Sequence, residues 1–230
     1  MKYLYVLFAF LILPWSTQAQ DYKQEREKMV SEQIARRGIK HVQTLDAMRK
    51  VERHLFVPPG NTRMAYADSP LAIGYGQTIS QPYIVAYMTQ IIEPKSTHKI
   101  LEIGTGSGYQ AAVLAEIVDK VYTIEIVPEL GETATDRLRK LGYDNVEVIK
   151  ADGYNGLEEH APFDAIVVTA ASEHIPPSLI QQLKEGGKMI IPVGSPFLVQ
   201  TLMLVEKKKG KLSTSSLMPV RFVPFTRSRE

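Results

Sequence analysis

The sequence of 230 residues has no cysteine, a single tryptophan and almost equal numbers of basic and acidic residues. Without cysteine the chain can form no disulfide, no thiolate zinc site and no cysteine nucleophile. The 27 basic and 25 acidic residues leave a formal net charge of +2, which indicates neither a nucleic-acid groove nor a polybasic membrane surface. Any recognition must therefore come from a local group of residues.

Long apolar runs are also missing, and the longest lies at the N-terminus. Lys2 is followed by an apolar run over 3–13, which at 11 residues is shorter than the roughly 20 that span a bilayer as a helix. Thr17 and Ala19 are small residues at the positions before a cleavage site. We expect residues 1–19 to be a secretory signal that is removed, with a buried N-terminal helix or an uncleaved anchor as the alternative.

The remaining residues, 20–230, suit a single domain with one core. Residues 21–92 are expected to hold short helices and a substrate loop, and residues 99–192 alternate short apolar strands with helices. Two or three consecutive strands are expected over 198–225. This order predicts an α/β fold with a mostly parallel sheet and an antiparallel C-terminal edge.

Glycine, threonine and proline residues indicate the expected helix boundaries in the first part of this domain. Gly38 is expected to end a helix that begins near Asp21, Thr44 to cap a second helix and Pro82 to begin a third. Residues 56–81 show no sustained period and contain several prolines and glycines, so we predict a long loop. Such loops inside a domain are usually functional or disordered.

A glycine-rich turn follows the first strand of the alternating region. Gly104, Gly106 and Gly108 come after an apolar strand and open a helix, a context in which the backbone can approach a ligand closely. The spacing departs from the G-x-G-x-x-G of dinucleotide enzymes, and no lysine follows as in a phosphate-binding P-loop. Plain tight turns use the same residues, so the turn alone does not identify a ligand.

Three acidic residues accompany three successive strands. Glu102 precedes the glycine turn, Glu125 lies 21 residues after Gly104 where a carboxylate can accept ribose hydroxyls, and Asp152 follows the next strand. Lining one crevice, they would repel a diphosphate and attract a cationic nucleoside such as S-adenosylmethionine. A single such acid is more often a capping or surface carboxylate, so the prediction depends on their joint placement.

The chain resembles the protein-L-isoaspartate (D-aspartate) O-methyltransferase family from about residue 29 to residue 225. The matching segments are PLAIGYGQTISQPY at 70–83, the glycine turn at 101–110, and the segments 161–166, 183–194 and 220–224. The glycine turn is shared by many methyltransferases, whereas the loop that ends in Gln-Thr-Ile-Ser-Gln-Pro is specific to this family. The resemblance implies a Rossmann-like, S-adenosylmethionine-dependent methyltransferase fold.

This resemblance also implies protein repair. The family transfers methyl from S-adenosylmethionine to the α-carboxyl of L-isoaspartyl, and of D-aspartyl, residues in damaged proteins, and the ester then forms a succinimide that reopens partly to aspartate. The active-site serine of the family corresponds to Ser80. The cofactor-lining positions that carry over, together with the acids above, are Gln77, Thr78, Ile79, Glu102, Gly104, Thr105, Gly106, Gly108, Glu125, Asp152 and Gly153.

The implied nucleophile is a carboxylate with a pKa of about 3.9 or lower, which is ionised at neutral pH and needs no general base. The five histidines are scattered without metal-ligand spacing, so we expect no metal. Ser80 would donate a hydrogen bond that orients the carboxylate. The alternative is that Ser80 only caps the helix that Pro82 begins.

Other functions stay open at this point, namely a methyltransferase for another carboxylate, or an exported binding protein that keeps the fold without a cofactor. The second follows from the expected signal, because a charged cofactor is not expected to cross a membrane unaided. We expect a monomer that acts on isoaspartyl-containing proteins, binds no nucleic acid and has no stable membrane association after processing. The expected location is periplasmic or secreted, with the cytoplasm, where the family usually works, as the alternative.

Overall fold

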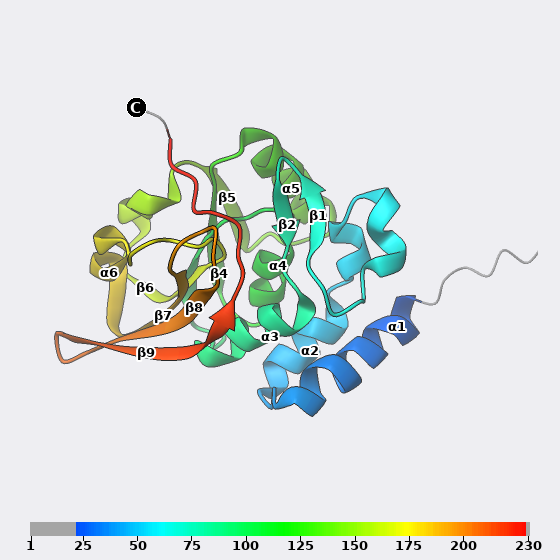
Figure 1. Ribbon diagram of the computed structural model, residues 1–230, viewed down its shortest axis with the longest axis horizontal. Helices are drawn as coiled ribbons and strands as arrows, with labels where there is room; N and C mark the ends of the chain where they lie inside the picture. Colours follow the sequence, from blue (N-terminus) through cyan, green and yellow to red (C-terminus); the bar gives the residue numbers. More distant parts are fainter. Residues whose placement is uncertain (1–21, 229–230) are drawn as a thin grey trace, which may run out of the picture.

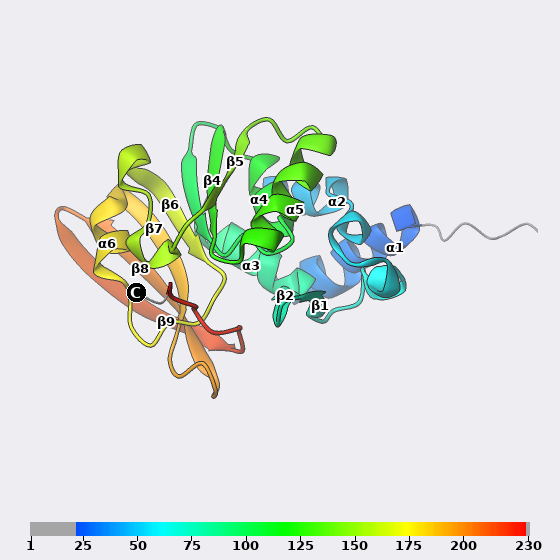
Figure 2. The ribbon, with the colours of Figure 1, turned by 90° about the horizontal axis from the view of Figure 1, so that it is seen from above.

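The computed structural model describes residues 22–228, and a seven-stranded sheet covered by helices forms its centre (Figures 1 and 2). The expected signal at 1–19 lies outside the described residues. In spatial order the strands are β5 (Val146–Lys150), β4 (Lys120–Glu125), β3 (Lys99–Ile103), β6 (Phe163–Val168), β7 (Leu183–Val193), β8 (Gln200–Lys208) and β9 (Lys211–Val220).

The first five strands of this order pair in parallel, and β8 and β9 complete the sheet with antiparallel pairs. This confirms the predicted mostly parallel sheet with an antiparallel C-terminal edge. Lys209 and Gly210, with φ of 53° and 70°, form the two-residue turn between β8 and β9. Two successive left-handed residues are what a tight hairpin turn of this twist requires.

Helices cover both faces of the sheet, α6 (Pro177–Gln182) on one side and the remaining α-helices on the other (Figure 2). The larger group comprises α1 (Tyr22–Lys28), α2 (Val42–Lys50), α3 (Pro82–Ile91), α4 (Tyr109–Ala115) and α5 (Pro128–Lys140). Alternate residues of β3 supply the two cores, since Ile100 packs with α2–α4 whereas Leu101 packs on the α6 side. No helix within residues 22–228 is both long and apolar enough to cross a membrane.

The expected helix boundaries are mostly confirmed. Gly38 ends the first helical region with φ of 96°, and Pro82 is the first residue of α3. The cap of the second helix is different, because α2 begins at Val42 with His41 before it. Thr44 is instead buried within the helix, and its Oγ1 lies 2.8 Å from His41 Nδ1. The Thr44 prediction is therefore wrong by one turn.

The segment 56–81 is not the single long loop that its composition indicates. It contains a 3₁₀ turn over Pro59–Met64 and a hairpin formed by β1 (Leu71–Gly74) and β2 (Gln77–Ile79). Strands of four and three residues are too short to establish a sequence period. The hairpin turn is instead marked by its glycines, since Gly74 and Gly76 both have positive φ.

Candidate active site

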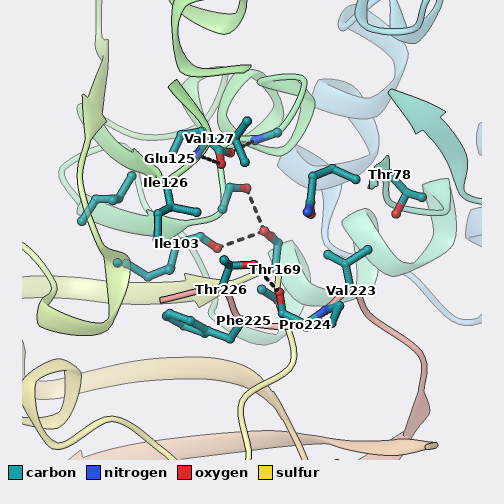
Figure 3. A pocket seen from close by; sticks show the side chains of 16 residues that line it. Thr78, Ile103, Glu125, Ile126, Val127, Thr169, Val223, Pro224, Phe225 and Thr226 are labelled. Atoms are coloured by element: carbon teal, nitrogen blue, oxygen red, sulfur yellow. Dashed lines mark hydrogen bonds between the residues drawn. The ribbon is translucent and has the colours of Figure 1, made fainter. Parts of the chain in front are cut away.

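A crevice lies at the carboxyl ends of β3, β4 and β6, where the C-terminal segment forms one of its walls (Figure 3). Six of the residues expected from the sequence line this crevice, namely Gln77, Thr78, Gly104, Gly106, Glu125 and Gly153. Its position agrees with the rule that ligands of open α/β sheets bind outside the carboxyl ends of the strands.

The turn after β3 is shaped by glycines in left-handed conformations. Gly104, Gly106 and Gly108 have φ of 98°, 53° and 86°. The Gly104 N–H donates to the Ile124 carbonyl at 2.8 Å, which ties the turn to the end of β4. A Cβ on Gly104 would lie 2.4 Å from Thr169 Oγ1, so a side chain at this position is excluded by both backbone and space.

Glu125 ends β4 and is only 5% exposed. Its Oε2 accepts a hydrogen bond from the Gly106 N–H at 2.7 Å, and its Oε1 accepts one from the Val127 N–H at 2.9 Å. These bonds fix the carboxylate at the crevice wall, and each oxygen keeps a further lone pair. The carboxylate can therefore accept two hydroxyl groups of a ligand, as a ribose would present them.

Glu102 is fully buried in β3 and lines a small cavity beside the glycine turn. Its Oε2 accepts a hydrogen bond from Thr123 Oγ1 at 2.5 Å, whereas its Oε1 has no partner among the described residues. Burial raises the pKa of Glu102 to about 8; the Thr123 hydrogen bond opposes this shift and nearby Glu125 adds to it. A cationic group beside Oε1 would supply the missing partner and favour the ionised carboxylate.

Asp152 follows β5, as expected, but one of its carboxylate oxygens, Oδ2, is bound by the C-terminal segment. Oδ1 accepts from the Tyr154 N–H at 3.0 Å, and Oδ2 accepts from Arg227 Nε at 2.8 Å and from the Ser228 N–H and Oγ. Burial alone would raise the pKa of Asp152, but these hydrogen bonds outweigh it and the pKa is lowered. The structure thus gives Asp152 an anchoring role, and direct cofactor contact stays a prediction.

Ser80 follows β2 and lies where the small cavity of Glu102 meets a wider groove. Thr78 lines both of these spaces and also the crevice, so the three are neighbours. Gln81 is the N-cap of α3, and the Ser80 hydroxyl has no hydrogen-bond partner between residues 22 and 228. The structure therefore does not give Ser80 the capping role that the sequence left open.

The segment that carries Ser80 is braced by charged residues. Arg37 pairs with Asp68 at 2.6 Å and lies 3.5 Å over the ring of Tyr83. Gln81 Nε2 donates to the Asp68 carbonyl at 3.1 Å. Farther back, the fully buried Arg53 donates to the Ala65 and Ser69 carbonyls at 2.7 and 3.4 Å. These contacts hold the backbone on both sides of the β1–β2 hairpin.

The other expected site residues lie around the small cavity or at the start of α4. Thr105 and Ile79 line the small cavity of Glu102, and Ile79 is also part of the core. Gly108 is the N-cap of α4, where a Cβ would lie 3.1 Å from the Leu138 side chain. Gly108 therefore permits α4 and α5 to pack closely and does not line the crevice.

Sequence reasoning missed the residues that complete the crevice. Thr169, at the end of β6, donates through Oγ1 toward the Ile103 and Gly104 carbonyls at 2.9 and 2.8 Å (Figure 3). Residues 223–226 of the C-terminal segment form the opposite wall. The match at 220–224 marked part of this segment but gave it no site role. Within residues 22–228, no group of three or more histidine or acidic residues is arranged to hold a metal ion.

Comparisons of the sequence and the fold with known proteins identify the family of the chain. The model of the family described as protein-L-isoaspartate(D-aspartate) O-methyltransferase matches residues 24–230. A protein-L-isoaspartate O-methyltransferase of Opitutus terrae is 58% identical over 205 residues, which are 89% of this chain and 88% of that protein.

Two solved structures share the fold. One protein-L-isoaspartate O-methyltransferase is 28% identical with a TM-score of 0.79, and the match covers 86% of this chain and 65% of that one. A Plasmodium falciparum protein described as belonging to the same class, in complex with S-adenosyl-L-homocysteine, is 27% identical with a TM-score of 0.75. That match covers 90% of this chain and 99% of the other. The chain belongs to the protein-L-isoaspartate (D-aspartate) O-methyltransferase family.

Proposed function

We propose that this chain is a repair methyltransferase that transfers methyl from S-adenosylmethionine to the α-carboxyl of L-isoaspartyl and D-aspartyl residues in damaged proteins. The observation that carries the proposal is the position of Thr78, which lines the crevice of Glu125, the small cavity of Glu102 and the open groove that contains Ser80. A cofactor in the crevice and a carboxylate in the groove would then meet at this residue. Membership of the family supports the same reaction.

The crevice fits S-adenosylmethionine, which when bound supplies an activated methyl group. The two carboxyl groups of Glu125 and Glu102 suit its hydroxyl and ammonium groups, because the first keeps free lone pairs and the second has a buried oxygen without a partner. The residues proposed to contact it directly are Gln77, Thr78, Ile79, Glu102, Gly104, Thr105, Gly106, Glu125 and Gly153. Gly108 and Asp152 would act through the helix and the C-terminal segment that they fix.

The substrate carboxylate is ionised at neutral pH, so the protein must orient it and exclude water rather than remove a proton. Ser80 has a free hydroxyl in the groove and would donate a hydrogen bond to this carboxylate. Correct orientation of two reactants can lower a barrier by up to ~7–11 kcal/mol. The bracing contacts of Arg37 and Gln81 would keep Ser80 in place for this purpose.

The reaction is tested by incubating the chain with methyl-labelled S-adenosylmethionine and an isoaspartyl peptide. We expect label on this peptide and none on the same peptide with ordinary aspartate. Label on both peptides would indicate a methyltransferase for another carboxylate. No label, although the chain is folded and the cofactor saturating, would favour the binding-protein alternative.

A Ser80→Ala substitution tests the role of the serine. Loss of one hydrogen bond to an ionised group corresponds to ~1.5–3 kcal/mol, so we expect turnover to fall about 10-fold to 100-fold while the dissociation constant of S-adenosylhomocysteine stays the same. Ser213→Ala, on the exposed face of β9, is the matched control. Turnover equal to that of the control would exclude the proposed role.

We further infer that residues 1–19 form a cleaved signal and that the mature chain is one periplasmic or secreted methyltransferase domain, 20–230. The apolar run after Lys2 supports this, as does a family match that begins only at residue 24. N-terminal sequencing of the chain made in its own host should find Gln20 first. An intact Met1 would favour the cytoplasm.

A further inference from the structure

The loop between β7 and β8 carries three consecutive exposed apolar residues. Phe197, Leu198 and Val199 are 88%, 68% and 53% exposed. In the described part of the chain, the other large exposed apolar residues are all separated from one another in sequence. A contiguous apolar surface on a water-soluble chain usually marks a binding site, whereas single exposed apolar residues are ordinary.

The exposure of these side chains is built into the fold by Gln200, which is itself 1% exposed. Its Nε2 donates to the Ser195 and Leu198 carbonyls at 3.0 and 2.9 Å, and its Oε1 accepts from the Phe222 N–H at 2.9 Å. One buried amide therefore fixes both the loop and the C-terminal segment. With the backbone held in this way, the apolar side chains cannot turn inward without breaking buried hydrogen bonds.

The loop is continuous with the groove that contains Ser80. Val199 and Phe222 line the groove together with Ser80 and Thr78. In Figure 2 the orange loop between β7 and β8 and the red C-terminal segment extend on the same side of the molecule as the β1–β2 hairpin. Phe197 and Leu198 directly precede Val199, so the exposed apolar stretch begins at the wall of the groove.

We propose that Phe197, Leu198 and Val199 form an apolar lip that binds an apolar side chain of an extended polypeptide, a few residues from the isoaspartyl residue held at Ser80. An extended chain advances about 3.3 Å per residue, so neighbours of the modified residue reach the lip. Locally unfolded segments expose apolar side chains that folded segments bury. The lip thus favours locally unfolded segments. This inference rests on the proposed function for the identity of the central residue.

The test uses fluorescently labelled isoaspartyl peptides in which a single leucine occupies, in turn, each of three positions on either side of the isoaspartyl residue, with serine elsewhere. Binding is measured by fluorescence anisotropy in the presence of S-adenosylhomocysteine, and methyl transfer is measured separately. We expect at least one leucine position to strengthen binding about tenfold over the all-serine peptide, the size of effect that one apolar contact gives. The double variant Phe197→Ser, Leu198→Ser should lose this advantage.

Val42→Ser, at an equally exposed apolar residue on α2, is the matched control and should keep the preference for leucine. Equal binding of all peptides, or a leucine advantage that survives in the double variant, would overturn the inference. The inference would also be overturned if the chain self-associates, the double variant abolishes this association and no peptide preference is found. The lip would then be an interface between two copies of the chain. Leucine-dependent binding without methyl transfer would instead contradict the proposed function and leave the lip intact.

Discussion

Two fully buried residues with ionisable side chains, Glu102 and Arg53, each have one polar atom without a hydrogen-bond partner among residues 22–228. Burial disfavours the charged form in both, and it raises the pKa of Glu102 to about 8 and lowers that of Arg53 to about 10. At neutral pH Glu102 is therefore mostly protonated and Arg53 stays charged. The carboxyl group of Glu102 lines the small cavity beside the glycine turn, whereas the guanidinium of Arg53 supports the backbone before β1.

Glu102 should make the stability of the ligand-free chain depend on pH. Its pKa is higher in the folded chain than the ordinary value of 4.5, so the folded chain binds more protons and loses stability as pH rises from about 4.5 to about 8. Glu102→Gln removes this loss and should be more stable than the natural chain at pH 8.5, by on the order of 5 kcal/mol, but not at pH 4.5. Urea unfolding across this range measures the difference. Glu159→Gln, at an exposed residue, should follow the natural profile, and parallel profiles for all three chains would refute the assignment.

Arg53→Ala should destabilise the chain strongly, because it leaves a cavity and two carbonyls, of Ala65 and Ser69, without their donor. Such losses amount to about 2–4 kcal/mol. Thermal and urea unfolding should both report the decrease. The exposed Arg63, changed in the same way, controls for loss of a positive charge and should alter stability by less than about 0.5 kcal/mol. Equal stability of the two variants would show that Arg53 is dispensable.

At the scale of an element, the glycine turn joins β3 to α4 and is hydrogen-bonded to the end of β4. Its first glycine meets two conditions at once, a positive φ and contact with Thr169, and its third lets α4 pack against α5. Sequence spacing shows only that glycines are present. The reason for each one appears when β4, β6 and α5 are placed around the turn.

Comparing Gly104→Ala with Gly142→Ala separates the cost of the positive φ from the cost of the contact with Thr169. The added methyl would lie 2.4 Å from Thr169 Oγ1 in a backbone conformation that costs a non-glycine residue about 1–2 kcal/mol. We expect a loss of stability of at least about 3 kcal/mol and loss of S-adenosylhomocysteine binding by calorimetry. Gly142→Ala shares the positive φ, 80°, but meets no atom within 4 Å, so only the backbone cost should appear there. Similar losses in both variants would mean that the Thr169 contact is harmless.

At the scale of the whole molecule, the C-terminal segment crosses the sheet end and ties distant elements together. The Ala171 N–H donates to the Val223 carbonyl and the Phe225 N–H donates to the Ala171 carbonyl, both at 2.8 Å. Arg227 then bonds Asp152, 75 positions earlier in the chain, and lies 3.8 Å over the ring of Tyr154. The residues between these anchors form a wall of the crevice in which we propose that the cofactor binds.

Arg227→Ala should loosen this wall. The carboxylate of Asp152, which is nearly buried, would lose a charged partner. Because the Arg227 side chain is half exposed, water screens this ion pair, and the loss of stability should be only about 1 kcal/mol. A coupling of that size corresponds to an approximately fivefold faster dissociation of S-adenosylhomocysteine, measurable by stopped flow. Arg139→Ala breaks an exposed pair with Asp136 on α5 and should leave the dissociation rate unchanged. An unchanged rate in Arg227→Ala would show that the anchor does not control the wall.

The sequence by itself determined the α/β class, the alternation of strands and helices in the region 99–192, and the family. Three features can be recognised from spacing along the chain alone. They are the periods of the apolar residues, the glycines after β3 and the acids at the ends of strands. The local sequence also identified Ser80 as part of a family motif and Pro82 as the first residue of α3. It failed where elements are very short, as in the β1–β2 hairpin, and at the start of α2, where Thr44 lies inside the helix and does not cap it.

Only the tertiary structure decided which of the predicted acids keep free hydrogen-bonding capacity at a cavity or crevice. It left one oxygen of Glu102 unpaired in a cavity, fixed Glu125 by two backbone amides and turned Asp152 toward Arg227. It also brought Thr169 and residues 223–226 to the crevice. These outcomes depend on contacts between residues far apart in the chain. Spacing along the chain does not reveal such contacts. They depend on the order of the strands in the sheet and on where the C-terminal segment packs.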